Sequence, residues 1–219
     1  MGELHFKMSV SVDGFVAGPN GESDWIFATS DPKAIAWEVA VFRNAGLHIM
    51  GSKTYAVMMA WWPFSNEVVA PAMNDIPKAV FTTKGAESVR KQQATAQDLK
   101  DANASLQRSG GQKREADPKA LKMWQDAYVA SGPIGDEIAK LKREHEKPIV
   151  AHGGAGFARS LIATGQVDKF FLLVHPFALG KGLPIFTRLE KPLSLELESS
   201  TAFPSGATGQ MYRPHSPLA

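Results

Sequence analysis

The sequence predicts an α/β domain built on a largely parallel sheet with flanking helices. Strand-like apolar runs alternate with helix-like segments along the chain, as they do in parallel sheets. Several of these runs end in junctions rich in glycine and hydroxyl side chains, where regular structure stops. A length of 219 residues with 44% hydrophobic composition suits one buried core, and no internal repeat is visible. We therefore expect a single domain over residues 1–219.

Composition excludes several classes of function. The chain has 24 basic and 22 acidic residues, too even a balance for the basic stripe of a nucleic-acid-binding protein. It has no cysteine, which excludes disulfides, thiolate zinc sites, iron–sulfur clusters and cysteine nucleophiles, and we predict no metal site. No apolar run reaches the roughly 20 residues of a membrane helix, and residues 1–7 do not resemble a signal peptide. We expect a cytoplasmic protein without nucleic-acid or membrane partners.

The first third of the chain predicts two strands and two helices. Apolar and polar side chains alternate over the first strand, and the glycines and the Asn-Gly pair that follow predict a long shaped loop. Asp31 is a candidate N-cap, with Pro32 at the first helical position. The expected elements are strand 4–12, loop 13–21, helix 32–44, strand 46–51, and a helix that begins near Tyr55 and is closed by Pro63.

The remainder continues this alternation of strands and helices. Apolar side chains at helical spacing predict two amphipathic helices, and a third helix follows the glycines after residue 152, with Gly165 at its end. The last two strands are half-exposed and form the edge of the sheet. The expected elements are strand 78–83, helices through Leu121–Trp124–Tyr128 and Ile134–Ile138–Leu141, strand 148–152, a helix through Phe157–Leu161–Ile162, and strands 168–175, 193–198 and 211–213.

Residues 87–117 differ in texture from the rest of the chain. The segment is strongly polar and offers few apolar anchors beyond Val89, Leu99 and Leu106. A segment that buries so little cannot offset the backbone entropy of ordering it, about 1–2 kcal/mol per residue. We interpret residues 87–117 as a tolerated surface insertion; a lid over the adenosine end of a cofactor is the alternative.

Three strand-to-helix junctions carry the chemistry that the sequence suggests. In a parallel sheet such junctions lie together at the carboxyl ends of the strands, where ligands bind. Glycine lets backbone N–H groups approach phosphate oxygens, helix N-termini add partial positive charge, and lysine or threonine side chains complete an anion site. The junctions are Gly51-Ser52-Lys53-Thr54, Thr82-Thr83-Lys84-Gly85 and Gly153-Gly154-Ala155-Gly156.

The glycine run at residues 153–156 is not a Rossmann fingerprint. Arg159 stands where the third glycine is required, and no acidic residue follows about 20 positions later at a strand end. The phosphate-loop signature that ends in Gly-Lys-Ser/Thr is also absent from the sequence.

The order and spacing of these motifs resemble the dihydrofolate reductase-like superfamily, and more closely the reductase domain at the C-terminus of the bifunctional riboflavin-biosynthesis deaminase-reductase. The resemblance covers nearly the whole chain outside residues 87–117. The matching residues are Ser11–Ala17, Trp25, Gly51–Tyr55, Phe81–Thr83, Gly153–Gly156, Leu161–Ile162, Gly165–Asp168, His175–Pro176 and Leu179–Phe186.

This resemblance implies a three-layer, mostly parallel fold with an antiparallel C-terminal edge, an NADPH-dependent reductase activity and a homodimer. It places the cofactor phosphates at Gly51, Ser52, Lys53 and Thr54 and at Gly153, Gly154, Ala155, Gly156 and Phe157. It places Thr82, Thr83 and Lys84 near the adenosine 2′-phosphate, Val16 and Ala17 beside the nicotinamide, and Asp13 and Trp25 near the substrate. Lysine and hydroxyl donors favour NADPH, since a site for NAD would carry a carboxylate.

The sequence also departs from the pattern of these families. The acidic residue that follows the loop tryptophan in folate reductases is replaced by Ser30, with Asp31 adjacent, and the glutamate before the paired glycines in riboflavin-pathway reductases is replaced by His152. The motifs of the zinc deaminase half are absent. The candidate proton donors are therefore Asp13, Asp31, His152 or an ordered water. Asp13 also suits a turn former, and His152 a hydrogen-bonded core residue.

Three functions remain open at this point. The first is hydride transfer from NADPH to a small heterocycle, either a pterin or a ribosylaminopyrimidine. The second is reduction of an unrelated carbonyl substrate. The third is a nucleotide-binding module without turnover, which the missing acid after Trp25 would suit.

Overall fold

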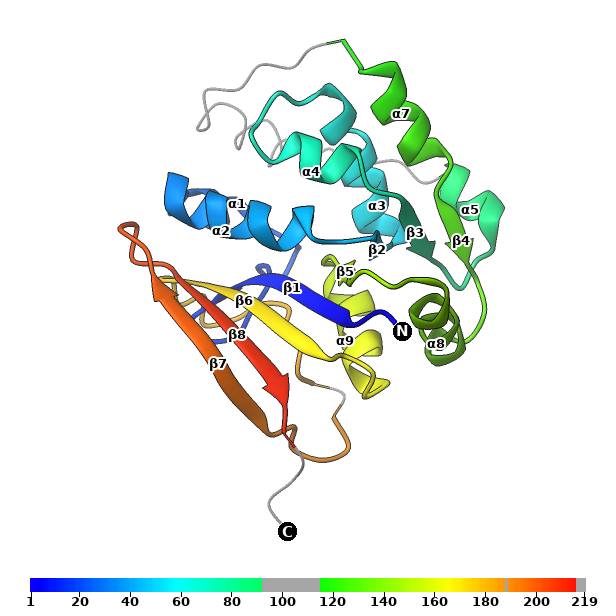
Figure 1. The fold of residues 1–219 in the computed structure, drawn as a ribbon. Helices are drawn as coiled ribbons and strands as arrows, with labels where there is room; N and C mark the ends of the chain where they lie inside the picture. The colour runs from blue at the N-terminus through cyan, green and yellow to red at the C-terminus, as the bar shows by residue number, and fades with distance from the viewer. Residues whose placement is uncertain (92–114, 188, 216–219) are drawn as a thin grey trace.

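The computed structural model describes residues 1–91, 115–187 and 189–215. Within those ranges, eight strands form one sheet in the order β4-β3-β2-β5-β1-β6-β8-β7 (Figure 1). Every adjacent pair from β4 through β3, β2, β5 and β1 to β6 is parallel. Strand β8 runs antiparallel to both β6 and β7. The predicted fold class, a mostly parallel sheet with an antiparallel C-terminal edge, is confirmed.

The sheet and its helices account for most of the described chain. The strands are β1 (Leu4–Ser11), β2 (Leu47–Gly51), β3 (Lys78–Phe81), β4 (Tyr128–Ala130), β5 (Ile149–Ala151), β6 (Lys169–His175), β7 (Leu195–Ala202) and β8 (Thr208–Pro214). The helices are α1 (Asp24–Phe27), α2 (Pro32–Arg43), α3 (Ser52–Met59), the 3-10 turn η1 (Trp62–Phe64), α4 (Ala70–Asn74), α5 (Ala86–Lys91), α7 (Pro118–Gln125), α8 (Ile134–Glu144) and α9 (Ala155–Ala163).

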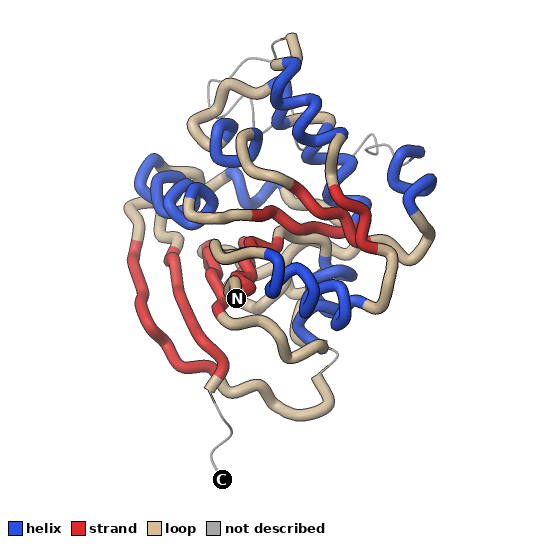
Figure 2. The backbone as a smooth tube through the Cα atoms, turned by 45° about the vertical axis from the view of Figure 1, so that its right-hand side comes forward, coloured by secondary structure: helices blue, strands red, loops and turns tan. Residues whose placement is uncertain are grey.

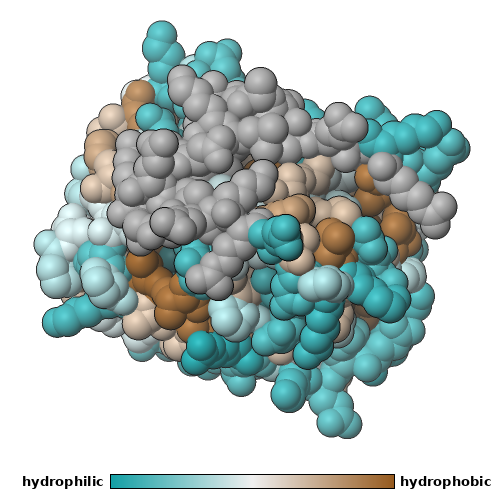
Figure 3. Space-filling view, turned by 90° about the horizontal axis from the view of Figure 1, so that it is seen from above, coloured by the Kyte–Doolittle hydropathy of each residue, from teal (hydrophilic) through white to brown (hydrophobic). Residues whose placement is uncertain are grey.

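Helices cover both faces of the parallel part of the sheet (Figures 1 and 2). On one face, α8 and α9 pack their apolar side chains against Leu4, Phe6 and Ile149 in the largest core cluster. On the other face, α2, α3, α4 and α7 enclose a second cluster with Met50 and Trp124. Where described residues form the surface seen from above, hydrophilic side chains surround hydrophobic patches (Figure 3). No helix in the described residues has the length and apolar character needed to cross a membrane.

Strand β1 is unusual because it is central and buried along its whole length, yet every second side chain is polar. A strand buried on both faces usually reads as a continuous apolar run. Here Leu4, Phe6, Met8 and Val10 join the core beneath α8 and α9, and the other face carries a polar row. The members of that polar row are His5, Lys7, Ser9 and Ser11.

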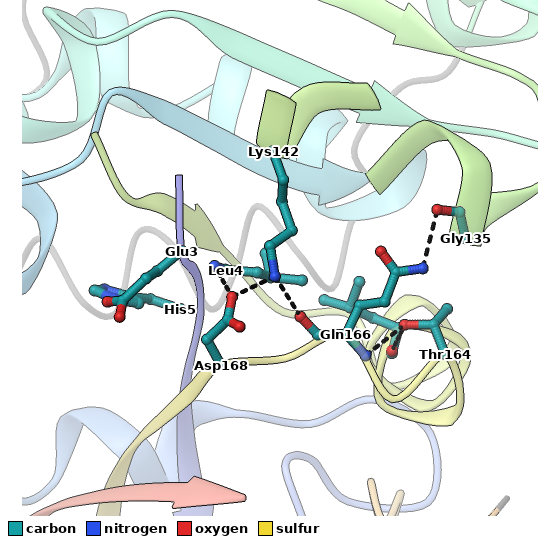
Figure 4. Close-up of polar contacts among 9 residues, drawn as sticks. Glu3, Leu4, His5, Gly135, Lys142, Thr164, Gln166 and Asp168 are labelled. Atoms are coloured by element: carbon teal, nitrogen blue, oxygen red, sulfur yellow. Dashed lines mark hydrogen bonds and ion pairs between the residues drawn. The ribbon is translucent and has the colours of Figure 1, made fainter. Parts of the chain in front are cut away.

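A partly buried ion pair between Lys142 and Asp168 stabilises the sheet at the end opposite the strand-to-helix junctions (Figure 4). The Asp168 carboxylate accepts hydrogen bonds from the Leu4 backbone N–H, at 2.6 Å, and from the Lys142 ammonium of α8. Lys142 also donates to the Gln166 carbonyl at 3.2 Å, and the Gln166 side chain donates to the Gly135 carbonyl at 3.0 Å. These contacts join β1, α8 and the segment before β6, so this ion pair has a structural role.

Several predicted element boundaries are wrong. The helix expected from near Tyr55 begins at Ser52, because Gly51 is in an extended conformation and the strand turns directly into the helix. It ends at Met59, and Pro63 lies in the separate turn η1. Tyr128 belongs to the short edge strand β4, because the preceding helix already ends at Gln125.

The described residues include only the two ends of the predicted insertion, 87–91 and 115–117. Residues 92–114 lie outside the described residues, so most of that prediction stays untested. However, the segment 87–91 belongs to α5, and Val89 is 6% exposed within the second core cluster. Asp117 caps α7 by accepting hydrogen bonds from two backbone N–H groups. Both ends of the predicted insertion are therefore built into the domain.

Candidate active site

The three glycine- and hydroxyl-rich junctions lie side by side at one edge of the sheet. Strands β3, β2 and β5 are consecutive neighbours, and their carboxyl ends carry Phe81, Gly51 and Ala151. The Thr54 hydroxyl donates to the Gly153 carbonyl at 2.7 Å, and this bond links the junction after β2 to the junction after β5. The sheet thus brings together the residues that the sequence predicts for cofactor phosphates.

Two helices point uncapped N-termini at this edge. The N-caps of α3 and α9 are Gly51 and Gly154, neither helix has a side-chain cap, and neither has an acidic residue in its first turn. By contrast, α2 and α7 are each capped by an aspartate that accepts two backbone N–H groups. Free N–H groups and the positive end of the helix dipole favour an anion such as a phosphate.

Three glycines at these junctions, Gly51, Gly153 and Gly154, have little room for a side chain. Gly154 has φ +98°, and a Cβ placed there would lie 2.7 Å from the Thr54 hydroxyl oxygen. A Cβ on Gly51 would lie 3.0 Å from the Phe157 Cβ, and one on Gly153 would lie 3.2 Å from the Met8 side chain. Glycine at these three positions therefore allows the junctions to pack closely.

The lysines predicted to read a 2′-phosphate lie beside these junctions. Lys53 is exposed in the first turn of α3, and Lys84 is exposed after β3. The Thr82 hydroxyl accepts a hydrogen bond from the Lys84 backbone N–H at 3.1 Å and contacts Ser88, whereas Thr83 is exposed. The loop after β1 is held by Val16 and Ala17, which exchange backbone hydrogen bonds with Leu183.

A cavity of about 1120 Å³ opens next to this edge, between the sheet and α1, α2 and α3. Its floor contains Lys7 and Ser9 from the polar row of β1, and Thr54 and Gly153 connect it to the junctions. Apolar and aromatic side chains form much of its walls. They include Ile26, Phe27, Ile35, Phe42, Val57, Met58, Trp61, Trp62, Val69 and Met73.

Lys7 and Glu38 form an ion pair inside the cavity. The Lys7 ammonium donates to the Glu38 carboxylate, and its side chain is only 9% exposed. It also lies 3.5 Å from the Ser9 hydroxyl and 5.5 Å from the centre of the Phe42 ring. Burying a charged pair costs desolvation free energy, so such a pair is a poor device for stability alone. We therefore count Lys7 and Glu38 among the candidate functional groups.

His152 is paired with a second buried histidine, His48. His48 Nε2 lies 3.1 Å from the Ala72 carbonyl and must donate to it, so His48 Nδ1 accepts from His152 Nε2 at 2.7 Å. Burial lowers the pKa of His48 to about 4, and burial with the neighbouring positive charges lowers the pKa of His152 well below 6.5. His152 lines the cavity as a neutral ring, which does not suit a proton donor near neutral pH.

The two candidate aspartates are engaged in structural hydrogen bonds. Asp13 is exposed and accepts from the Ser11 hydroxyl and from two backbone N–H groups of the loop after β6. Asp31 caps α2 and accepts from Ser205 N–H; burial acts to raise the pKa of Asp31, but these hydrogen bonds outweigh it and lower the pKa. Asp31 lines the cavity as a carboxylate, whereas Asp13 is not part of its lining.

Trp25 lies beside the cavity but is not part of its described lining. Its buried ring packs edge-on against His175, with the ring centres 5.5 Å apart. His175 Nδ1 is hydrogen-bonded to the Thr29 hydroxyl at 2.6 Å, and its Nε2 is buried without a protein partner among the described residues. Burial lowers the pKa of His175 to about 4. His175 contributes to the cavity wall.

Sequence reasoning missed Lys7, Glu38 and His48. Lys7 could have been found, because polar residues on a strand that must be central predict a functional surface rather than a solvated one. Glu38 and His48 gave no comparable signal: a glutamate on a helix face and a histidine in a short strand are common in any domain. Only the fold shows that these side chains meet over the same face of the sheet.

Comparisons with known proteins agree with this geometry. The profile of the family described as RibD C-terminal domain matches residues 3–208. The uncharacterized protein YyaP of Bacillus subtilis is 24% identical over 205 residues, which is 94% of this chain and 91% of that protein.

Solved structures share the fold at low identity. A putative riboflavin biosynthesis protein from Shewanella has a TM-score of 0.68 at 18% identity, with 98% of this chain and 99% of that chain covered. A pyrimidine reductase-like protein from Corynebacterium diphtheriae has a TM-score of 0.60 at 14% identity, covering 99% and 93%. Dihydrofolate reductase from Enterococcus faecalis, solved with NADP(H), has a TM-score of 0.57 at 12% identity, covering 98% and 97%.

Proposed function

The chain belongs to the family of RibD C-terminal domains, and from that premise we propose that it is a reductase that uses NADPH to deliver hydride to a small heterocyclic substrate. The observation that carries the proposal is the pair of uncapped, glycine-started helices beside a large, mostly apolar cavity. Such helix ends bind the phosphates of a dinucleotide, and the cavity has the volume for a nicotinamide and a small planar substrate.

The residues present fit NADPH. The backbone N–H groups at the starts of α3 and α9, with the Thr54 hydroxyl nearby, would hold the pyrophosphate. Lys53, Thr83 and Lys84 would bind the 2′-phosphate. Val16 and Ala17 would line the nicotinamide. When bound, this cofactor supplies a hydride.

Side chains of the protein would orient the substrate and hold a proton close to it. Lys7 holds a proton at Nζ inside the cavity, and Glu38 fixes the direction of that ammonium group. His152, kept neutral and anchored by His48, packs against the Phe42 ring at 5.0 Å between ring centres and closes the wall next to Gly153. The apolar walls exclude water from the reacting atoms. A homodimer and a cytoplasmic location stay predictions.

The test is NADPH consumption over a panel of pterins and aminouracils, together with NADPH affinity measured by tryptophan fluorescence. We expect tight NADPH binding and substrate-dependent loss of NADPH absorbance with at least one panel member. Tight binding with no turnover on the whole panel would favour the cofactor-binding module. Failure to bind NADPH would contradict the proposed function altogether.

A further inference from the structure

The described residues that line the cavity carry more negative than positive charge. Among the described residues that line it, Lys7 is the one cation, and the carboxylates are Asp31, Glu38 and Glu67. Lys7 is already paired with Glu38, whose side chain is 19% exposed. Asp31 is held ionised by the hydrogen bonds that cap α2. A second anion that enters this space would meet like charges in a region of low dielectric constant.

The Lys7–Glu38 pair presents a donor next to an acceptor. An ammonium group has three N–H donors, and the described contacts of Lys7 use two of them, toward Glu38 and Ser9. The Glu38 carboxylate has two oxygens, and the contact with Lys7 uses Oε1. A donor and an acceptor side by side complement a lactam edge, in which a ring carbonyl is adjacent to a ring N–H.

The aromatic walls of the cavity favour a flat ring next to the Lys7–Glu38 pair. The centre of the Phe42 ring lies 5.5 Å from the Lys7 ammonium, and Trp61 and Trp62 line the same cavity. Aromatic and aliphatic walls with a few convergent polar groups are typical of sites for planar ligands. The charges, the donor–acceptor pair and the walls thus describe one kind of ligand.

We propose that the substrate of this site is a phosphate-free heteroaromatic lactam, neutral or cationic, whose carbonyl and ring N–H contact Lys7 and Glu38. The inference rests on the proposed function and narrows it, because it excludes the phosphate esters of ribosylaminopyrimidines as preferred substrates. The only phosphates accepted would be those of the cofactor, at the uncapped ends of α3 and α9.

The experiment compares two ligands that differ only in the phosphate: an aminouracil riboside and its phosphate ester, titrated into protein with NADPH present. We expect the riboside to bind at least about tenfold more tightly, because like charges brought together at a binding site cost one or more kcal/mol. The Glu38→Gln variant keeps an acceptor oxygen and removes one charge, so this ratio should fall by about threefold or more. Glu144→Gln, on exposed α8 surface, is the matched control and should leave the ratio unchanged.

A second measurement does not depend on how the variant folds. In the wild type, raising the ionic strength to about 1 M shortens the Debye length to about 3 Å and should also reduce the ratio. Equal or tighter binding of the phosphate ester would overturn the inference, as would binding of neither ligand to a protein that binds NADPH. NADPH affinity measured without either ligand tests the proposed function separately, so the two failures are distinguishable.

Discussion

Lys53 and Lys84 lie on two neighbouring junctions, and both side chains are exposed, so each is accessible to an anion in solvent. Changing both to alanine should weaken NADPH more than NADH, because only NADPH carries the 2′-phosphate. Removing each charge-assisted hydrogen bond should cost about 1.5–3 kcal/mol of binding free energy. Fluorescence titration of both cofactors measures this, and Lys122→Ala on exposed α7 surface is the control. Equal weakening of NADPH and NADH would place the 2′-phosphate elsewhere.

Three buried histidines make the free energy of unfolding depend on pH. Burial lowers the pKa of His175 to about 4, whereas the unfolded chain takes up that proton near pH 6.5. Between these values the unfolded state binds more protons, so stability falls as the pH falls, by up to about 1.4 kcal/mol per pH unit for each such group. His48 and His152 act in the same direction.

Urea unfolding at several pH values between about 4 and 6.5 tests this linkage. The wild type should lose stability steadily across that range, and His175→Asn should show a slope smaller by about one proton. His215→Asn, at an exposed position, should keep the wild-type slope. A His175→Asn slope equal to that of the wild type would contradict a neutral, buried His175.

Residue identities predicted part of the site and not the rest. The grouping of the proposed phosphate-binding junctions was predictable, because glycine, hydroxyl and lysine residues follow three strands that are neighbours in the sheet. The roles of the candidate proton donors were harder to predict. Asp13 and Asp31 carry the right chemistry but lie at positions where the backbone needs acceptors. His152 is kept neutral by burial, next to a histidine about a hundred residues earlier in the chain. Such long-range pairing leaves no local signal.

Strand-to-helix junctions are the elements on which the site depends. Gly154→Val should abolish NADPH binding, because a side chain at φ +98° meets the Thr54 hydroxyl and displaces the start of α9. The measurement is fluorescence titration of NADPH, with circular dichroism to confirm the fold. Gly135→Ala in α8 is the control, since its Cβ would approach only the flexible Gln166 side chain, at 3.3 Å. A folded Gly154→Val variant with normal affinity would exclude this junction as the phosphate site.

Periodic helices and apolar strands were predictable as elements, whereas the shortest helices and the edge strand β4 were not. The helices α2, α8 and α9 follow clear apolar stripes. The strand β1 follows an alternation of apolar and polar side chains, and β5 and β6 follow apolar runs. Helices α1 and α4 have only four and five residues and gave no stripe to detect. The helix α5 lies in strongly polar sequence and has no apolar stripe, because Val89 is its only residue in the described core clusters. No pattern in the sequence therefore indicated this helix.

At the scale of the whole molecule, the two faces of the parallel sheet serve different purposes. The face beneath α8 and α9 is core, and the face beneath α2 and α3 carries the polar row of β1 and the cavity. The carboxyl edge joins that cavity to the uncapped helices. A cofactor that spans the edge would therefore contact both, and its binding free energy should appear as added stability of the entire fold.

Urea unfolding with and without NADPH tests this central claim most directly. At a free concentration about 100 times its dissociation constant, NADPH should raise the free energy of unfolding of the wild type by about 2.7 kcal/mol. The same concentration of NADPH should give no gain to Gly154→Val. An unchanged stability of the wild type, or an equal gain in the variant, would contradict the assignment of the cofactor site to the junctions after β2 and β5.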